Sequence, residues 1–209
     1  AYENTDHPAV SHLSFTAKAG TTTALVGHSG SGKSTTASLI PRFYDVQQGA
    51  VKIGGVDIRE IPHADLMKMV AFVFQDPKLF KDTLLENIRA GRPSATRDEV
   101  LQAARLAQCD DILEKFPDGL DTVVGSKGVY LSGGETQRIA IARAILKDAP
   151  IVVLDEATAY ADPENEQQIQ KAFEGLVKGK TVIMIAHRLS TIQDADLILV
   201  MLSLIHISE

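Results

Sequence analysis

One stretch decides the fold of this chain: Gly27-His28-Ser29-Gly30-Ser31-Gly32-Lys33-Ser34. It matches the pattern G-x-x-x-x-G-K-[ST], in which backbone N–H groups surround a phosphate. The apolar run 24–26 before it is typical of a buried strand, and residues 35–40 after it can continue as a helix until Pro41. An ordinary Gly/Ser turn between a strand and a helix is the alternative. Because Lys33 and Ser34 occupy the positions that the pattern requires, and a strand and a helix are expected on either side, the sequence favours a triphosphate-binding loop.

The residue types in the loop each have a chemical use. Glycines let the backbone come close to a phosphate, and a helix N-terminus offers N–H groups without intrahelical partners. Lys33 is expected to reach the β- and γ-phosphates, and the Ser34 hydroxyl is expected to hold Mg²⁺. The predicted nucleotide-binding residues of the loop are Gly27, His28, Ser29, Gly30, Ser31, Gly32, Lys33, Ser34 and Thr35.

Composition sets the broad class. The 209 residues are enough for one large domain or two small lobes, and 44% hydrophobic with 23% charged residues is ordinary for a globular protein. A net charge of −6 gives no electrostatic reason to expect nucleic acid as a partner. The single cysteine, Cys109, excludes an internal disulfide and a cysteine-cluster metal site, and we expect it to be a small core residue.

The two ends of the chain look artificial. The chain starts without an initiator methionine or a leading strand, and residues 202–209 have neither a turn residue nor helical periodicity. This tail resembles the translation of a transposon adapter used in sequencing libraries, so we interpret it as non-native and leave it out of the fold prediction. A natural edge strand is the alternative. The interpretation makes the chain a gene fragment cut on both sides.

The order of apolar segments predicts an α/β fold with a helical insert. Continuous apolar runs at 70–74, 151–154, 181–185 and 197–201 are typical of strands covered on both faces of a mixed or parallel sheet. Residues 10–26 alternate as strands would, and glycines bracket a hairpin arm at 50–53, which predicts a smaller antiparallel β subdomain. Helices are expected at 61–69, 83–89, 97–107, 110–116 and 134–146, and one beginning at Asp162-Pro163. The lobes are then about 1–75 with 148–201 for the sheet, and about 76–147 for the helices.

A second chemical signal follows the strand at 151–154. Asp155 and Glu156 come at its carboxyl end, where ligands gather in open α/β sheets. Asp155 is expected to hold Mg²⁺, and Glu156 is expected to act as the general base on the attacking water. The alternative is that both are solvated acids at the end of a strand. The presence of a phosphate loop in the same chain disfavours this alternative.

A third signal is Leu131-Ser132-Gly133-Gly134-Glu135. Ser132 and Glu135 form a capping box, which by itself explains a helix start. Capping does not require two glycines, however, and glycines at a helix N-terminus make a second anion-binding surface. Two surfaces for a γ-phosphate and only one loop predict a head-to-tail pair of domains, in which each lends these residues to the nucleotide on the other.

With these motifs in this order, residues 1–201 resemble the ATP-binding cassette (ABC) ATPase family. The resemblance implies ATP and Mg²⁺ as cofactors. It also implies that Gln75 contacts Mg²⁺ and water and senses a transmembrane partner, that His187 acts at the γ-phosphate, and that Asp162 contacts the other domain. Tyr2 occupies the position of the aromatic residue that stacks on adenine.

Finer features resemble exporter half-transporters, in which a membrane domain precedes the ATPase on the same chain. They are the stretches 72–83, Glu86-Asn87-Ile88 and 185–191. The likeness implies a site at the cytoplasmic face of a membrane, a transmembrane-domain partner, and a second ABC domain as homodimer or heterodimer. The loop 122–128 lacks the acids usual in exporters, and Ala159-Tyr160-Ala161-Asp162 resembles a variant found in importing siderophore transporters, so the direction of transport stays open.

The expected function is therefore ATP binding and hydrolysis that powers transport through a domain dimer. Two alternatives belong to other classes. One is a soluble ABC ATPase that acts on nucleic acid or ribosomes, which the acidic balance disfavours. The other is a regulatory clamp that binds ATP without hydrolysing it.

Overall fold

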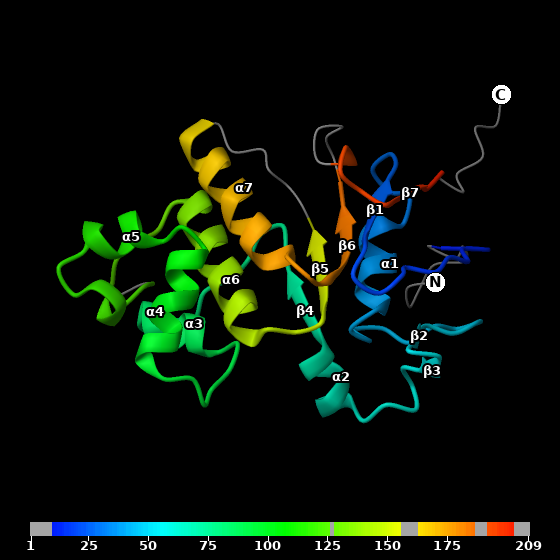
Figure 1. The fold of residues 1–209 in the computed structure, drawn as a ribbon, viewed down its shortest axis with the longest axis horizontal. Helices are drawn as coiled ribbons and strands as arrows, with labels where there is room; N and C mark the ends of the chain where they lie inside the picture. The colour runs from blue at the N-terminus through cyan, green and yellow to red at the C-terminus, as the bar shows by residue number, and fades with distance from the viewer. Residues whose placement is uncertain (1–9, 126–127, 156–162, 187–191, 203–209) are drawn as a thin grey trace. The chain divides into compact units, whose positions relative to one another are not determined.

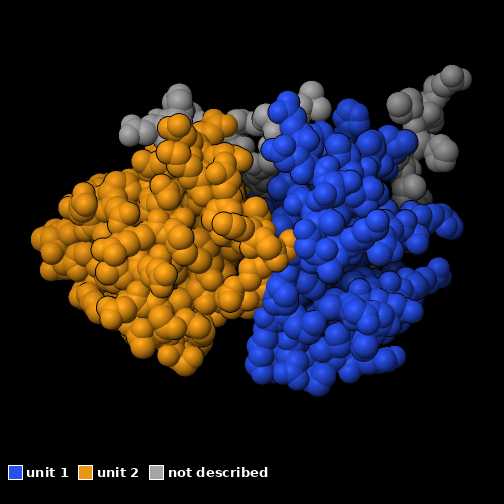
Figure 2. Space-filling view, viewed as in Figure 1, with its two compact units in different colours: residues 1–72, 150–156, 181–209 blue, residues 73–149, 157–180 orange. Residues whose placement is uncertain are grey.

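The computed structural model describes residues 10–125, 128–155, 163–186 and 192–202. They divide into two compact units (Figure 2). The sheet unit comprises residues 1–72, 150–156 and 181–209, and the helical unit comprises residues 73–149 and 157–180. This division places the helix that starts at Pro163 with the other helices, whereas the sequence suggests that it belongs to the sheet lobe; the lobe boundaries stay a prediction.

In the described residues of the sheet unit, five strands form a sheet in the order β4-β5-β6-β1-β7 (Figure 1). Their bounds are β1 Thr22–Val26, β4 Val70–Val73, β5 Ile151–Asp155, β6 Thr181–Ile185 and β7 Leu197–Val200. β1 pairs in parallel with both β6 and β7, and β5 pairs in parallel with β6. The α/β prediction with a parallel core sheet is thus confirmed, and each apolar run predicted as a strand contains one.

The central strands are mostly apolar because both of their faces are covered. Leu25, Val153 and Ile185 are fully buried and form one cluster with Leu66 and Val70. Helix α1 (Lys33–Leu39) contacts β5 and β6.

The alternation over residues 10–18 does not produce a strand, which corrects the sequence-based expectation. Val10, Phe15 and Ala17 nevertheless pack against the core cluster. Their apolar side chains are drawn to the core, but within the described part of the chain no neighbouring strand pairs with their backbone.

A small antiparallel sheet completes this unit. β2 (Lys52–Ile53) pairs with β3 (Val56–Asp57) across Gly54-Gly55, so the predicted hairpin arm is present but short. Both glycines have positive φ, which is the conformation that tight two-residue hairpin turns require. Helix α2 (His63–Met69) follows and leads into β4.

The helical unit contains the remaining elements. They are α3 Leu84–Arg89, α4 Arg97–Leu106, α5 Asp110–Lys115, the 3₁₀ turn η1 Gly119–Asp121, α6 Gly133–Lys147 and α7 Pro163–Val177. Helix α6 is the centre of the unit because α3, α4 and α7 all contact it. The predicted caps are correct: the Thr83 side chain accepts from the Glu86 N–H, and Thr96 with Glu99 closes a full capping box. Cys109 is fully buried, as expected, and burial raises the pKa of its thiol to about 12.

Helix α3 and the turn after it pack tightly against α6. Asn87 is fully buried, and its side chain donates to the carbonyls of Phe80 and Thr83 at 3.0 and 2.9 Å. The Arg143 Nε of α6 donates to the Asn87 carbonyl at 2.7 Å. Close by, a Cβ on Gly91 would lie 2.2 Å from the Arg143 carbonyl oxygen. Only a residue without a side chain lets the turn approach the helix this closely.

Gly91→Ala is therefore expected to destabilise the protein by about 1–3 kcal/mol, as overpacking against fixed backbone does. Chemical denaturation with the midpoint and slope fitted together measures this change. Ser94→Ala, at an exposed position in the same turn, is the control and should stay within about 0.5 kcal/mol of the parent. Equal effects of the two substitutions would contradict the tight contact.

Candidate functional site

The predicted phosphate loop begins directly after β1 and is shaped by a backbone contact. Gly27 has a φ of 153°, and a Cβ there would lie 2.2 Å from the Met201 carbonyl oxygen and 2.8 Å from the Ser31 hydroxyl. The Met201 N–H donates to the Val26 carbonyl at 2.7 Å, which continues the pairing of β1 with β7. The end of β7 therefore fixes where the loop leaves the sheet, and only glycine fits at its first position.

Lys33 occupies the inside of this loop. It is only 5% exposed. Its ammonium donates to the carbonyl oxygens of Gly27 and His28, each at 2.8 Å, and to the Ser31 hydroxyl at 3.3 Å. All three partners are uncharged, so the loop surrounds a full positive charge that no acid among the described residues neutralises. Such a cation is suited to an anionic ligand, because a buried charge gains most from an opposite one.

The start of α1 presents the other groups of the loop. Gly32 is the N-cap in the left-handed conformation, with φ 88°, and without a side chain it makes no capping hydrogen bond. The first turn of α1 carries no acidic residue that would repel an anion. Ser34 is exposed and Thr35 is partly buried, so the Ser34 hydroxyl is open to a ligand.

Asp155 ends β5 at the same edge of the sheet. In the register of the sheet, Asp155 is paired with Ile185, and Ile185 is paired with Leu25, two residues before Gly27. Two strand spacings amount to about 10 Å, so Asp155 and the loop share one carboxyl edge. A carboxylate and a serine hydroxyl offer the oxygen ligands that Mg²⁺ prefers. The donor set at this edge fits that ion.

In the helical unit, Ser132 is the N-cap of α6, and Gly133, Gly134 and Glu135 form its first turn. The Ser132 hydroxyl accepts from the Glu135 N–H at 3.2 Å, and the Glu135 carboxylate accepts from the Ser132 N–H at 2.7 Å, which confirms the capping box. Ser132 and Gly133 are exposed and Leu131 is half-buried. A Cβ on Gly134 would lie 3.1 Å from the Asn165 side chain. The second glycine therefore serves packing against α7, whereas the first lies open.

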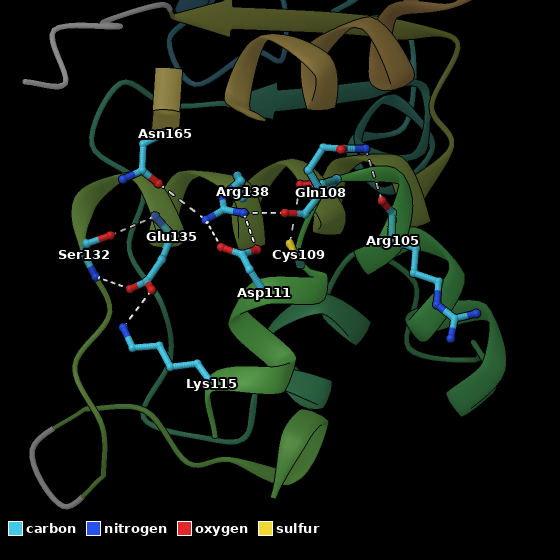
Figure 3. A network of polar contacts seen from close by, with 10 residues as sticks. Arg105, Gln108, Cys109, Asp111, Lys115, Ser132, Glu135, Arg138 and Asn165 are labelled. Atoms are coloured by element: carbon cyan, nitrogen blue, oxygen red, sulfur yellow. Dashed lines mark hydrogen bonds and ion pairs between the residues drawn. The ribbon is translucent and has the colours of Figure 1, made fainter. Parts of the chain in front are cut away.

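Glu135 is charged although it is buried. Burial alone would raise the pKa of its carboxyl group, but hydrogen bonds from Lys115 and from the Ser132 N–H outweigh burial and hold that pKa below its usual range. Lys115 Nζ lies 2.8 Å from the Glu135 carboxylate (Figure 3).

The remaining predicted site residues divide into two groups. Gln75 is exposed and lies two positions beyond the end of β4. Tyr2, Glu156, Asp162 and His187 lie outside the described residues. The structure thus brings the loop and Asp155 to one sheet edge and gathers residues 131–135 at one helix start, and the roles of the others stay predictions.

A family model described as ABC transporter matches residues 10–159. The chain belongs to the ABC transporter family. It is 53% identical over 189 residues to an ATP-dependent lipid A-core flippase of Legionella pneumophila (strain Paris), covering 90% of this chain and 32% of that protein. It is 50% identical over 201 residues to the ATP-dependent lipid A-core flippase of Chromobacterium violaceum, covering 96% of this chain and 34% of that protein. It is 51% identical over 200 residues to the protein of the same name from Vibrio cholerae, covering 95% of this chain and 34% of that protein. The chain spans about a third of the length of these curated relatives.

Sequence reasoning misses two contributors to this ABC domain. The apolar pattern assigns Met201 only to the last strand, whereas its carbonyl shapes the phosphate loop. Lys115 is not singled out by any motif, since twenty residues separate it from Glu135. The sequence feature that could have indicated such a lysine is the acid at position 135, because a carboxylate buried at a helix start needs a cation nearby.

The contact at Gly27 can be tested against a second glycine of the same unit. Gly27→Ala should destabilise the protein by at least about 2 kcal/mol, because the added methyl group meets a backbone carbonyl. Gly20→Ala is the control, since Gly20 also has positive φ, but an added Cβ there would meet no atom of the described residues within 4 Å beyond its chain neighbours. It should cost about 1 kcal/mol, from strain alone. Thermal unfolding of both variants measures the difference, and equal losses would contradict the close approach of Met201.

Proposed function

We propose that this chain is the ATP-binding and ATP-hydrolysing domain of a membrane ABC transporter of the exporter type. The observation that carries the proposal is the buried Lys33 ammonium, which is surrounded by loop carbonyls at 2.8 Å and has no acidic partner in the part of the chain that the structure describes. When a triphosphate enters, the ammonium can exchange neutral carbonyls for phosphate oxygens. Membership of the ABC transporter family supports ATP as that triphosphate.

The residues of the sheet edge would divide the work of holding the nucleotide. Lys33 and the N–H groups of residues 27–35 would bind the phosphates, with Tyr2 against the adenine. Ser34, Gln75 and Asp155 would hold Mg²⁺. That ion, when bound, neutralises charge on the β- and γ-phosphates. The other residues then only need to orient groups around a partly neutralised ligand.

For hydrolysis we assign the base to Glu156. It follows Asp155 directly, so it comes after the strand end that lies at the carboxyl edge with the loop. A carboxylate there can accept a proton from the attacking water. His187 follows β6, the strand between β1 and β5, and would contact the γ-phosphate; Gln75 would help to position the water.

A second copy, or a related domain, would complete each site. Residues 131–135 form an exposed, glycine-containing helix start in the helical unit, and they would contact the nucleotide bound by the partner, with Asp162 at the same interface. The exposed Gly133 next to the N-cap Ser132 supports this assignment, since a capping box does not require a glycine there.

The complete protein is proposed to sit in a membrane, with this domain at the cytoplasmic face. The relatives are named ATP-dependent lipid A-core flippases, and the chain covers about a third of each. We propose that a transmembrane domain on the same native chain moves a lipid of that class. Within the described residues, no helix has the length and apolarity for a membrane crossing.

We expect lipid A, but not phosphatidylcholine, to stimulate the ATPase activity of the complete protein.

Removing the loop cation should weaken nucleotide binding. Lys33→Ala is expected to weaken ATP affinity by roughly 10–100-fold, the effect of losing one or two charge-assisted hydrogen bonds. Isothermal titration with ATP and Mg²⁺ measures it. Lys52→Ala removes an exposed lysine of the same unit and should leave the affinity unchanged. Unaltered ATP binding by Lys33→Ala would refute the loop assignment.

Replacing the base should separate binding from turnover. Glu156→Gln is expected to keep ATP affinity and to lower kcat by about 100-fold or more, trapping the paired domains with ATP. A phosphate-release assay on the complete protein, with size analysis in ATP, gives both readouts. Glu174→Gln on α7, an exposed acid, is the control. A parent protein that binds ATP without releasing phosphate would support the regulatory clamp instead.

A further inference from the structure

Two ion pairs join α5 to the first turns of α6 (Figure 3). Lys115 Nζ lies 2.8 Å from the Glu135 carboxylate, and Arg138 donates to both oxygens of Asp111 at 2.6 and 2.9 Å. Each helix presents an acid and then a base, four residues apart on α5 and three residues apart on α6. Both spacings place the two charges on one face of their helix, so each acid can meet the base of the other helix.

Burial is distributed unequally in these pairs. The α6 side chains are buried, with Arg138 1% and Glu135 10% exposed, whereas their α5 partners are about half exposed, with Asp111 at 50% and Lys115 at 52%. These two buried charges of α6 are thus each neutralised by a charge on α5. Removal of either α5 partner would leave a buried charge uncompensated.

The two buried charges lie at different distances from the exposed helix start. Glu135 belongs to the capping box, since its carboxylate accepts the Ser132 N–H. Arg138 lies about one turn deeper and also donates to Asn165 at 3.4 Å, which packs against Gly134. Glu135 therefore contributes a negative charge directly at residues 131–135, where it would repel an approaching anion.

We propose that Lys115 is a positioning residue for the nucleotide of the partner domain, because it neutralises the carboxylate that caps α6. The proposal rests on the assignment of residues 131–135 to that nucleotide. Lys115 keeps the capping hydrogen bonds of Glu135 while removing its net charge from the surface that meets the triphosphate. The ammonium is itself held in place, since it lies 5.3 Å from the centre of the Phe116 ring.

The proposal predicts different effects on the KM for ATP when each of the two ion pairs is broken. Lys115→Met leaves an uncompensated carboxylate at residues 131–135 and should raise the KM for ATP by roughly tenfold, with a smaller change in kcat. Asp111→Asn leaves an uncompensated guanidinium one turn deeper and should not raise the KM. Both variants loosen α5 from α6, so both should lower the melting temperature. A purely structural role would change the KM in the same direction for both.

A charge cycle completes the test in the complete protein. Glu135→Gln keeps an acceptor for the Ser132 N–H, so Lys115→Met combined with Glu135→Gln should return the KM to near the parent value although no ion pair is restored. Lys180→Met removes the partner of Asp148 in the same unit and controls for the loss of a paired lysine. A double variant as impaired as Lys115→Met, or an equal rise in KM for Asp111→Asn, would overturn the inference.

The same experiment separates this inference from the proposed function. A parent protein without ATP turnover, or with ATP affinity insensitive to Lys33→Ala, would refute the ATPase assignment and this inference with it. A parent that hydrolyses ATP normally, but shows the same KM in Lys115→Met, would refute the role of Lys115 alone.

Discussion

The contact between Gly27 and the Met201 carbonyl is the constraint on which the sheet unit depends. A Cβ there would come within 2.2 Å of that oxygen, so the loop and the end of β7 can lie together only without a side chain. The approach follows from the parallel pairing of β1 with β7, which ends in the hydrogen bond from Met201 to Val26. Because the loop turns away at this point, the carbonyls of Gly27 and His28 face inward and can accept from Lys33. A packing limit in the backbone thus sets where a charge is placed.

Buried charges are stabilised in different ways in the two units. Lys33 is held by neutral carbonyls and a hydroxyl, which satisfy its hydrogen bonds without cancelling its charge. Glu135 and Arg138 are held by residues of opposite charge, which cancel it. The first arrangement leaves a field for an anion, and the second removes one. A phosphate-binding site in the sheet unit would need an uncancelled positive charge. A helix start in the helical unit that only approaches a phosphate would instead need its negative charge cancelled.

Local chemistry explains which features could be predicted from the sequence. Continuous apolar runs mark the strands at 151–155 and 181–185, and short-range residue pairs mark the capping boxes at 96–99 and 132–135; the structure contains all of them. The alternation at 10–18 predicts strands wrongly, since a strand needs a partner that no local pattern supplies. The Met201 contact and the Lys115–Glu135 pair could not be predicted, because they join positions 174 and 20 residues apart that only tertiary packing brings together. The site residues at 156, 162 and 187 rest on motifs and stay predictions.

The acid at position 135 shows how a helix cap and an approaching anion can be reconciled. An acid in the first turn of a helix is favourable to that helix, because it meets the positive end of the helix dipole and accepts the Ser132 N–H. The same charge opposes any phosphate brought to that turn. A lysine placed on α5 resolves the conflict without disturbing the cap, since the carboxylate has two oxygens: one accepts from Ser132 and the other from Lys115. Helix stability and anion approach are then no longer in competition, and a residue twenty positions away becomes part of the physical explanation of the motif.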